Sequence, residues 1–200
     1  MPNTGKSALA ARLAKLSDFP FVRLISPESL VGYTELAKCN AINKTFEDSY
    51  KSSLSVIVVD AIERLLDWSP IGSRFSNLVL QTLLVLLKKR PPKGKKLLVL
   101  CTTSQREVLR QMEVLDSFDG QIETPLIRDL AHVRAVVRQR QLFASAAEED
   151  AAFSQLQAET GGRLTPGIGI KRLLNVIDRA AQSKHVGASF ADNLLSALDR

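Results

Sequence analysis

The sequence predicts an α/β protein in which a mostly parallel sheet is flanked by helices and followed by a small helical domain. Three observations support this expectation. Apolar runs of strand length alternate with amphipathic stretches up to Pro125, and only helical periodicity follows. The chain has 200 residues, 45% hydrophobic and 24% charged, which suits one full domain with a small companion. This composition excludes collagen-like and low-complexity proteins.

Three apolar runs are rich in β-forming residues and predict buried strands at residues 19–25, 54–59 and 96–101. A weaker fourth strand is expected at residues 121–123. Because the stronger runs are continuously apolar rather than alternating, we expect their strands to be covered on both faces.

Amphipathic stretches between the strands predict helices. They lie at residues 5–16, 34–50, 73–89 and 105–113 in the first part, and at 127–144, 147–160, 169–183 and 187–199 in the second, with Gly161-Gly162 and Pro166-Gly167 as breaks. The strand–helix rhythm indicates parallel strands with helices on both sides. We therefore expect an α/β domain over residues 1–126 and an entirely helical domain over residues 127–200.

The net charge of +6, from 27 basic and 21 acidic residues, is concentrated in one segment. Residues 88–96 contain six cations and no acid, so the rest of the chain is neutral. A nucleic-acid-binding protein is expected to spread its basic residues over a face, which disfavours a nucleic-acid partner. The sequence also predicts neither a membrane span nor a secretory signal, and Cys39 and Cys101 suggest buried reduced thiols rather than a disulfide or zinc site.

The segment Pro2-Asn3-Thr4-Gly5-Lys6-Ser7 is similar to the phosphate-binding motif GxxxxGK[ST] without its first glycine. Backbone N–H groups around Gly5 to Ser7 would form an anion nest at the start of a helix. Lys6 would reach the β- and γ-phosphates, and the Ser7 hydroxyl would coordinate Mg²⁺. The alternative is a solvated tail, because a short Gly-Lys-Ser sequence also occurs by chance.

Asp60 ends the second predicted strand, 53 residues after Ser7. An acid at the carboxyl edge of such a strand is expected beside a phosphate-binding loop, where it would hold Mg²⁺ through water. The alternative role for Asp60 is a helix N-cap, since residues 61–63 begin a helical turn. The two motifs together predict a nucleotide-binding protein.

The chain resembles the second ATPase domain of the N-ethylmaleimide-sensitive fusion factor family, the vesicle-fusing ATPases, within the AAA+ proteins. The residues that carry the resemblance are concentrated between 30 and 125: Lys38-Cys39-Asn40-Ala41-Ile42, residues 50–60, residues 62–67, residues 70–72, residues 74–81 and residues 83–89. In the second domain Ile168-Gly169-Ile170-Lys171 also matches. The resemblance implies that the first strand and the leading glycine precede Met1, so that the chain is an N-terminally truncated fragment.

The resemblance implies a site for ATP and Mg²⁺. Its nucleotide-contacting residues would be Asn3, Thr4, Gly5, Lys6, Ser7, Ala8, Asp60, Ile168, Gly169 and Lys171, with Ser7 and Asp60 as metal ligands. Lys88 and Lys96 match lysines that reach the γ-phosphate bound to a neighbouring subunit, and their alternative is a solvated turn. Thr102 and Thr103 match the position that contacts the γ-phosphate or attacking water, and otherwise they would cap the next helix.

Two departures from an active site predict slow hydrolysis, and a third predicts weak contact with a polypeptide substrate. Ala61 stands where the family's catalytic glutamate follows the Walker B aspartate, so the attacking water lacks its base. No arginine finger precedes Phe118-Asp119. Residues 30–33 lack the aromatic residue that precedes the glycine in a substrate-gripping pore loop, and we expect Tyr33 to pack instead.

The resemblance implies a homo-hexamer that binds ATP and, within a full-length protein, disassembles SNARE complexes with SNAP adaptors. Such a protein would be cytoplasmic and associate peripherally with vesicle or Golgi membranes through partners, without inserting into them. One alternative is an active ATPase in which Glu63 replaces the missing base. A DNA-loading AAA+ protein is a weaker alternative because the basic residues are not spread over a face, and a P-loop kinase is disfavoured by the long helical part.

Overall fold

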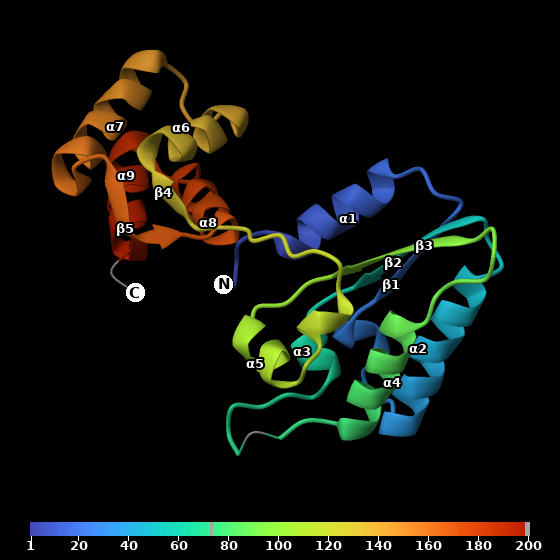
Figure 1. Ribbon diagram of the computed structural model, residues 1–200. Coiled ribbons are helices and arrows are strands. Elements are labelled where there is room, and N and C mark those ends of the chain that lie inside the picture. Colours follow the sequence, from blue (N-terminus) through green and yellow to red (C-terminus); the bar gives the residue numbers. More distant parts are fainter. Residues whose placement is uncertain (73, 199–200) are drawn as a thin grey trace. The chain divides into compact units, whose positions relative to one another are not determined.

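A computed structural model describes residues 1–72 and 74–198 (Figure 1). It divides into two compact units: one comprises Lys6–Ile122, and the other comprises Met1–Gly5 and the chain from Glu123 onward. Residues 73 and 199, at the ends of two expected helices, lie outside the described residues.

The first unit is built on a parallel sheet of three strands in the order β1-β2-β3. These are β1 (Phe21–Ile25), β2 (Leu54–Val59) and β3 (Lys96–Cys101), where the three strongest apolar runs predict them. Val59 of β2 pairs with Ile25 of β1 and with Cys101 of β3. All three strands therefore end at one edge, which is where ligands of open α/β sheets bind.

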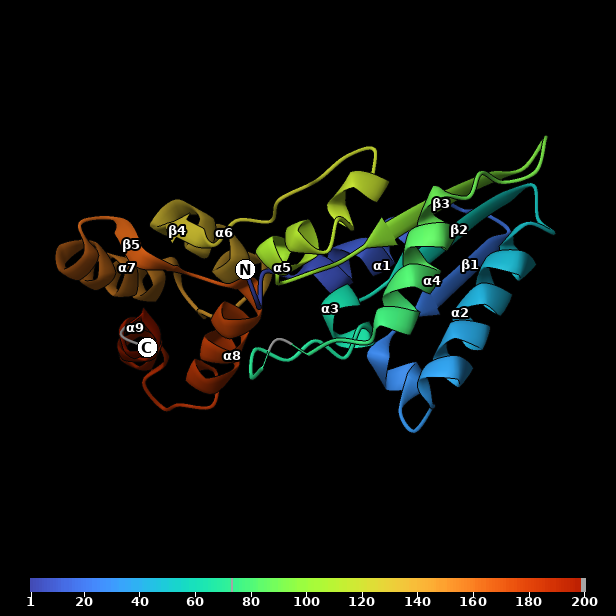
Figure 2. The same cartoon turned by 60° about the horizontal axis from the view of Figure 1, so that its bottom comes forward.

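Side chains of β2 alternate between the two faces and explain why helices cover both. Val56 and Val58 pack with Ala10 and Ala14 of α1 (Lys6–Leu16) on one face. Ile57 and Val59 belong to the larger core on the other face, with apolar residues of α2 (Glu35–Ser49) and α4 (Asn77–Lys88). Figures 1 and 2 show α1 on the opposite side of the sheet from α2 and α4. The predicted α/β class with flanking helices is confirmed.

Helices α2 and α4 begin at residues suited to capping. Thr34 accepts a hydrogen bond from the Ala37 N–H at the start of α2, and Ser76 accepts one from the Val79 N–H at the start of α4, each at 3.3 Å. Short helices α3 (Ile62–Leu65) and α5 (Arg106–Gln111) follow β2 and β3. Two 3₁₀ turns, Pro27–Leu30 and Leu115–Ser117, complete the unit.

The second unit contains four helices within the described residues, with a core of their apolar faces. They are α6 (Leu130–Gln139), α7 (Ala146–Thr160), α8 (Ile170–Ala180) and α9 (Val186–Leu198). Leu156, Leu173 and Phe190 are buried in this core. No helix in the described part of the chain is long and apolar enough to cross a membrane.

Two secondary-structure predictions are wrong. Residues 121–123 form no strand, because Ile122 is the run's one apolar side chain and it is 84% exposed, so burial does not favour an extended strand there. The second unit is not entirely helical, since β4 (Ile127–Asp129) and β5 (Arg163–Ile168) pair antiparallel. Pro166 suggested a break, but a two-stranded sheet consists of edge strands, which tolerate proline.

Candidate nucleotide site

The carboxyl edge of the sheet brings together two of the predicted site residues. Asp60 follows β2 and Thr102 follows β3, and the Thr102 hydroxyl donates a 2.6 Å hydrogen bond to Asp60 Oδ1. The same hydroxyl accepts a 2.9 Å hydrogen bond from the Ala61 N–H. Asp60 is half-buried, and its Oδ2 accepts none of the hydrogen bonds found within the described residues. One oxygen is thus held in place and the other remains available to a ligand.

Asp60 does not act as a helix cap. The residue at the N-cap of α3 is Ala61, which has a left-handed backbone (φ 48°) and provides no side-chain hydrogen bond to the helix. The hydrogen bond from Thr102 orients Asp60 across the strand ends instead. The helix-cap alternative for Asp60 is therefore wrong.

The amino end of α1 lies at the same edge of the sheet. Helix α1 packs on β2 and runs antiparallel to the strands, as both Figure 1 and Figure 2 show. Lys6 and Ser7 are its first two residues, and Ala8 continues the first turn. The first turn of a helix presents unpaired backbone N–H groups and about half a positive charge, both of which favour a bound phosphate.

The other predicted phosphate-loop residues associate with the start of α8. The Asn3 carbonyl accepts a 3.1 Å hydrogen bond from the Lys171 N–H, and a Cβ added at Gly169 would lie 2.7 Å from the Asn3 oxygen. Gly5 has φ +84°, which favours glycine, and a Cβ there would lie 3.0 Å from Ile170. The structure therefore brings Asn3 together with Gly169 and Lys171, beside the end of β5 at Ile168.

Thr4 makes its own connection within the second unit. Its hydroxyl lies 2.8 Å from the hydroxyl of Thr124. The predicted nucleotide contacts thus fall into two groups, one around Asn3 and Lys171 in the second unit and one around Lys6, Ser7 and Asp60 in the first.

Thr103 and Glu63 form a second connection between the strand ends. The Thr103 hydroxyl donates to Glu63 Oε2 at 2.7 Å, and the Ser104 N–H donates to Glu63 Oε1 at 3.0 Å. Glu63 is only 7% exposed. Sequence reasoning missed this role of Glu63, although the parallel pairing of β2 and β3 places the residues that follow each strand side by side.

Thr103 also accepts a 3.0 Å hydrogen bond from the Gln105 N–H immediately before α5. Gln105 itself occupies the N-cap of α5, and the helix start has no side-chain cap, so Thr103 contacts the residue before the helix and does not cap it. Both threonine hydroxyls donate to carboxylates of the β2 end.

Lys96 lies far from Asp60 along their own sheet, and Lys88 is the last residue of α4. Lys96 is the first residue of β3 and pairs with Leu54, whereas Asp60 follows the far end of β2. Five residues of extended chain separate the two edges by roughly 16 Å. Both lysines are exposed, while Lys89 lies over the Tyr50 ring at 5.4 Å and Lys95 donates to the Lys51 carbonyl at 3.0 Å. Lys88 and Lys96 are therefore accessible to a second molecule.

The exposure of Tyr33 contradicts one prediction. We expected its ring to pack, but it is 49% exposed, whereas Leu30 before it is buried. Gly32 has φ +81° and turns the chain after the 3₁₀ segment, so Tyr33 points outward before Thr34 caps α2.

The cysteines are free, as the sequence predicts, and Cys39 is buried. Burial raises the pKa of the Cys101 thiol to about 12, so it stays protonated at neutral pH.

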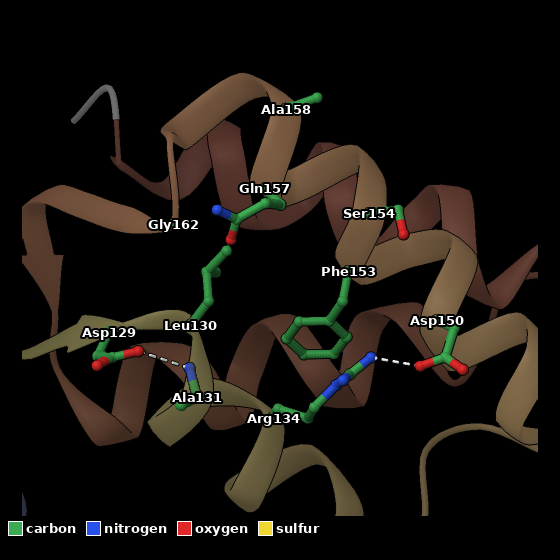
Figure 3. Close-up of a pocket in the computed structure, with 10 residues that line it drawn as sticks. All are labelled: Asp129, Leu130, Ala131, Arg134, Asp150, Phe153, Ser154, Gln157, Ala158 and Gly162. Carbon is green, nitrogen blue, oxygen red and sulfur yellow. Dashed lines mark hydrogen bonds and ion pairs between the residues drawn. The ribbon is translucent and has the colours of Figure 1, made fainter.

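A hollow of about 710 Å³ lies between α6 and α7 and contains none of the predicted site residues (Figure 3). Arg134 is the one cation among the described residues that line it. Its guanidinium lies over the Phe153 ring at 4.8 Å and contacts Asp150 at 2.6 Å and Glu149 at 2.8 Å. Because two carboxylates already neutralise this charge, the hollow is poorly suited to a phosphate.

The residues at the strand ends fit a magnesium nucleotide. Asp60 Oδ2 and the Ser7 hydroxyl are hard oxygen donors, which Mg²⁺ prefers, and Mg²⁺ retains most of its waters in such sites. The amino end of α1 suits the phosphates. No cluster of three or more His, Cys, Asp or Glu side chains suited to a metal occurs in residues 1–72 and 74–198, so a metal would depend on the nucleotide for further ligands.

The sequence profile of the ATPase family associated with various cellular activities (AAA) matches residues 1–126. This chain belongs to that family, whose α/β fold with a parallel sheet agrees with the first unit.

Relatives of the chain include proteins named for vesicle fusion. It is 44% identical to the vesicular-fusion protein sec18 of Schizosaccharomyces pombe over 98% of this chain and 24% of the relative. It is also 44% identical to the vesicle-fusing ATPase of Dictyostelium discoideum over 99% of this chain and 25% of the relative. The chain thus spans about a quarter of the length of these relatives.

Proposed function

We propose that this chain is the ATP-binding, ring-forming part of a vesicle-fusing ATPase and corresponds to the second ATPase domain of the N-ethylmaleimide-sensitive fusion factor family. The observation that carries the proposal is the link between Asp60 and Thr102 at the strand ends, at the same sheet edge as the amino end of α1. The relatives named vesicle-fusing ATPases support the same assignment.

In the proposed site, Lys6 neutralises the terminal phosphates, and Ser7 and Asp60 hold Mg²⁺, Asp60 in part through water. Asn3, Thr4, Gly5 and Ala8 complete the phosphate loop, and Ile168, Gly169 and Lys171 contact the nucleotide from the second domain, residues 127–200. The bound Mg²⁺ would supply charge neutralisation between the phosphates. Thr102 keeps Asp60 oriented toward the metal.

The proposed domain binds ATP more than it hydrolyses it. The methyl group of Ala61 carries no proton acceptor for the attacking water, and a positioned base contributes about 10²–10⁴-fold to such reactions. Glu63, the substitute base in the alternative of an active ATPase, has both oxygens engaged by Thr103 and Ser104 and is buried. These contacts disfavour the alternative.

Within a full-length protein, the proposed role is to hold a homo-hexamer together while ATP hydrolysis elsewhere disassembles SNARE complexes with SNAP adaptors. Lys88 and Lys96 would contact the γ-phosphate of a neighbouring copy, which agrees with their exposure at the sheet edge opposite Asp60. The protein would work in the cytoplasm and reach vesicle or Golgi membranes through its partners. The cations concentrated in residues 88–96 disfavour DNA loading.

Thermal unfolding with and without Mg-ATP tests the proposal. A ligand at 100 times its dissociation constant stabilises the folded state by about 2.7 kcal/mol, which raises the midpoint of a chain this size by about 5–10 °C. Lys6→Ala should abolish most of this rise, whereas Lys15→Ala, at the far end of α1, should retain it. An equal rise in wild type and Lys6→Ala would refute the phosphate assignment.

A further inference from the structure

The ends of β2 and β3 are joined by a series of hydrogen bonds that extends well past the sheet. The Thr102 N–H donates to the Val59 carbonyl at 2.9 Å, continuing the strand pairing, and the Ile62 N–H donates to the Thr102 carbonyl at 3.1 Å. Side chains take over from there, through the pairs Thr102–Asp60 and Thr103–Glu63. Residues 59–63 therefore hold the first three residues of the segment 102–105, namely Thr102, Thr103 and Ser104.

Glu63 makes the outermost contacts of this series. One of its oxygens accepts from the Thr103 hydroxyl and the other from the Ser104 N–H, so the carboxylate holds two successive residues. Hydrogen bonds to a charged acceptor are stronger than neutral ones, and their loss in a buried place leaves the donors unsatisfied. With 7% exposure, Glu63 has little room for water to replace it.

We propose that Glu63 is a positioning residue that fixes the segment 102–105, and that this fixed segment lets the site distinguish ATP from ADP. The inference rests on the proposed nucleotide site. Segment 102–105 begins at the carboxyl end of β3, directly beside Asp60. A terminal phosphate bound at this edge would lie next to the segment, so its binding would depend on where the segment is held. Glu63 acts on it from behind, through Thr103 and Ser104, without contacting the nucleotide itself.

A positioning role and a general-base role predict different effects of Glu63→Gln: a positioning residue would keep its two contacts, whereas a general base would lose its function in hydrolysis. A glutamine amide can accept from the Ser104 N–H through its oxygen and donate to the Thr103 hydroxyl through its nitrogen, so it preserves both contacts. It cannot accept a proton from water. Glu63→Leu fills similar space but loses both contacts, and Thr103→Val removes one of them with little change of shape.

The experiment measures two quantities in the 200-residue chain and these variants. The first is hydrogen exchange at the Ser104 amide without nucleotide, with the Thr102 amide, which donates to a backbone carbonyl, as internal control. The second is the ratio of dissociation constants for Mg-ADP and Mg-ATP. Global unfolding midpoints show whether each variant remains folded.

We expect Glu63→Gln to retain the ADP/ATP ratio of wild type and to keep the Ser104 amide better protected than in Glu63→Leu, with slightly faster exchange than in wild type because the acceptor is neutral. In Glu63→Leu the Ser104 amide should exchange at least about tenfold faster than in wild type, as expected for loss of one hydrogen bond to a charged acceptor, while the Thr102 amide stays protected. The ADP/ATP ratio should fall toward one in Glu63→Leu and partly in Thr103→Val. If Glu63→Leu does not fold, Thr103→Val and Glu63→Gln still give both readouts.

Unchanged Ser104 exchange in Glu63→Leu, or in Thr103→Val an unchanged ADP/ATP ratio, would overturn the inference. So would a Glu63→Gln variant that loses the preference for ATP, because charge rather than position would then matter. If wild type binds neither nucleotide, the proposed function and the discrimination both fail, whereas the Ser104 amide still decides whether Glu63 fixes the segment.

Discussion

Ala61 and Thr102 are the residues at the strand ends where the proposed function separates nucleotide binding from hydrolysis. The Ala61 backbone donates to the Thr102 hydroxyl, which in turn donates to Asp60, so the metal-ligand candidate is oriented without any group from the Ala61 side chain. A carboxylate at position 61 would add a proton acceptor beside this arrangement. Under the proposed function, the retained contacts suit binding of a magnesium nucleotide, and the missing carboxylate would limit turnover.

Ala61→Glu should increase ATP hydrolysis modestly, by about tenfold, because it restores a base for the attacking water while no arginine finger precedes Phe118. Phosphate release at saturating Mg-ATP measures the rate. Ala61→Gln, similar in size but unable to accept the proton, is the matched control. A high rate in wild type would contradict the assignment of position 61.

Cys101 should make stability fall at alkaline pH. Its pKa is raised from 9.0 to about 12 by burial, so between pH 9 and 12 the unfolded chain loses a proton that the folded chain keeps. Its stabilising effect is complete below pH 9, and the free energy of unfolding should decrease by about 1.4 kcal/mol per pH unit from this group above it. Denaturant titrations at pH 8, 10 and 11 should show a shallower decrease for Cys101→Ala. Equal slopes would mean that the thiol titrates normally when folded.

At the scale of elements, the strong apolar runs predicted the strands of the sheet correctly. Helix α1 covers one face of that sheet. Residues 54–59 predicted β2 because burial on both faces requires a continuous apolar run, and the structure buries Val56 against α1 and Ile57 against the other layer. Residues 163–168 escaped prediction because strand pairing with residues 127–129 is a long-range contact that local periodicity does not record. Pro166 added a misleading signal.

The candidate site was foreseen in part for the same reasons. Asp60 and Thr102 were placed by the ends of apolar runs, so their proximity follows from parallel pairing. The contacts of Glu63 with Thr103 and Ser104 depend on how the chain turns after each strand, including the left-handed Ala61. Nothing in composition or spacing specifies that turn.

Helix α4 provides a prediction at this scale. Ser76 is 3% exposed and its hydroxyl accepts from the Val79 N–H, so Ser76→Ala should lower the free energy of unfolding by about 1 kcal/mol through loss of the cap. Urea unfolding measures the change. Thr82→Ala, within the same helix and only partly buried, should cost less. A loss no larger than that of Thr82→Ala would show that the cap contributes little.

For the whole molecule, the proposed function links the positive charge concentrated in residues 88–96 to assembly. This segment leads from α4 into β3, whose first residue, Lys96, lies at the sheet edge opposite Asp60, and the cations at positions 88, 90, 93 and 96 are exposed. An ATP-dependent contact between copies would use Lys88 and Lys96 of one copy and the γ-phosphate bound to another. Assembly can then prefer ATP over ADP only by the differential interaction with that phosphate.

Replacing both Lys88 and Lys96 by alanine should leave nucleotide binding to a single copy intact but remove the preference of assembly for ATP. Arg90→Ala with Lys93→Ala removes the same charge from the same segment and is the matched control, since Lys89 and Lys95 have contacts of their own. Light scattering in Mg-ATP and Mg-ADP measures assembly. Equal weakening by both pairs would indicate that the segment acts through bulk charge.

The most direct test of ATP-dependent ring formation is sedimentation velocity of the wild-type chain without nucleotide, with Mg-ADP and with Mg-ATP. The proposed function predicts that Mg-ATP shifts the chain to a discrete larger species of ring size, while the other two conditions leave mainly smaller species. The same sedimentation profile in all three conditions, at nucleotide concentrations that saturate the site, would contradict it.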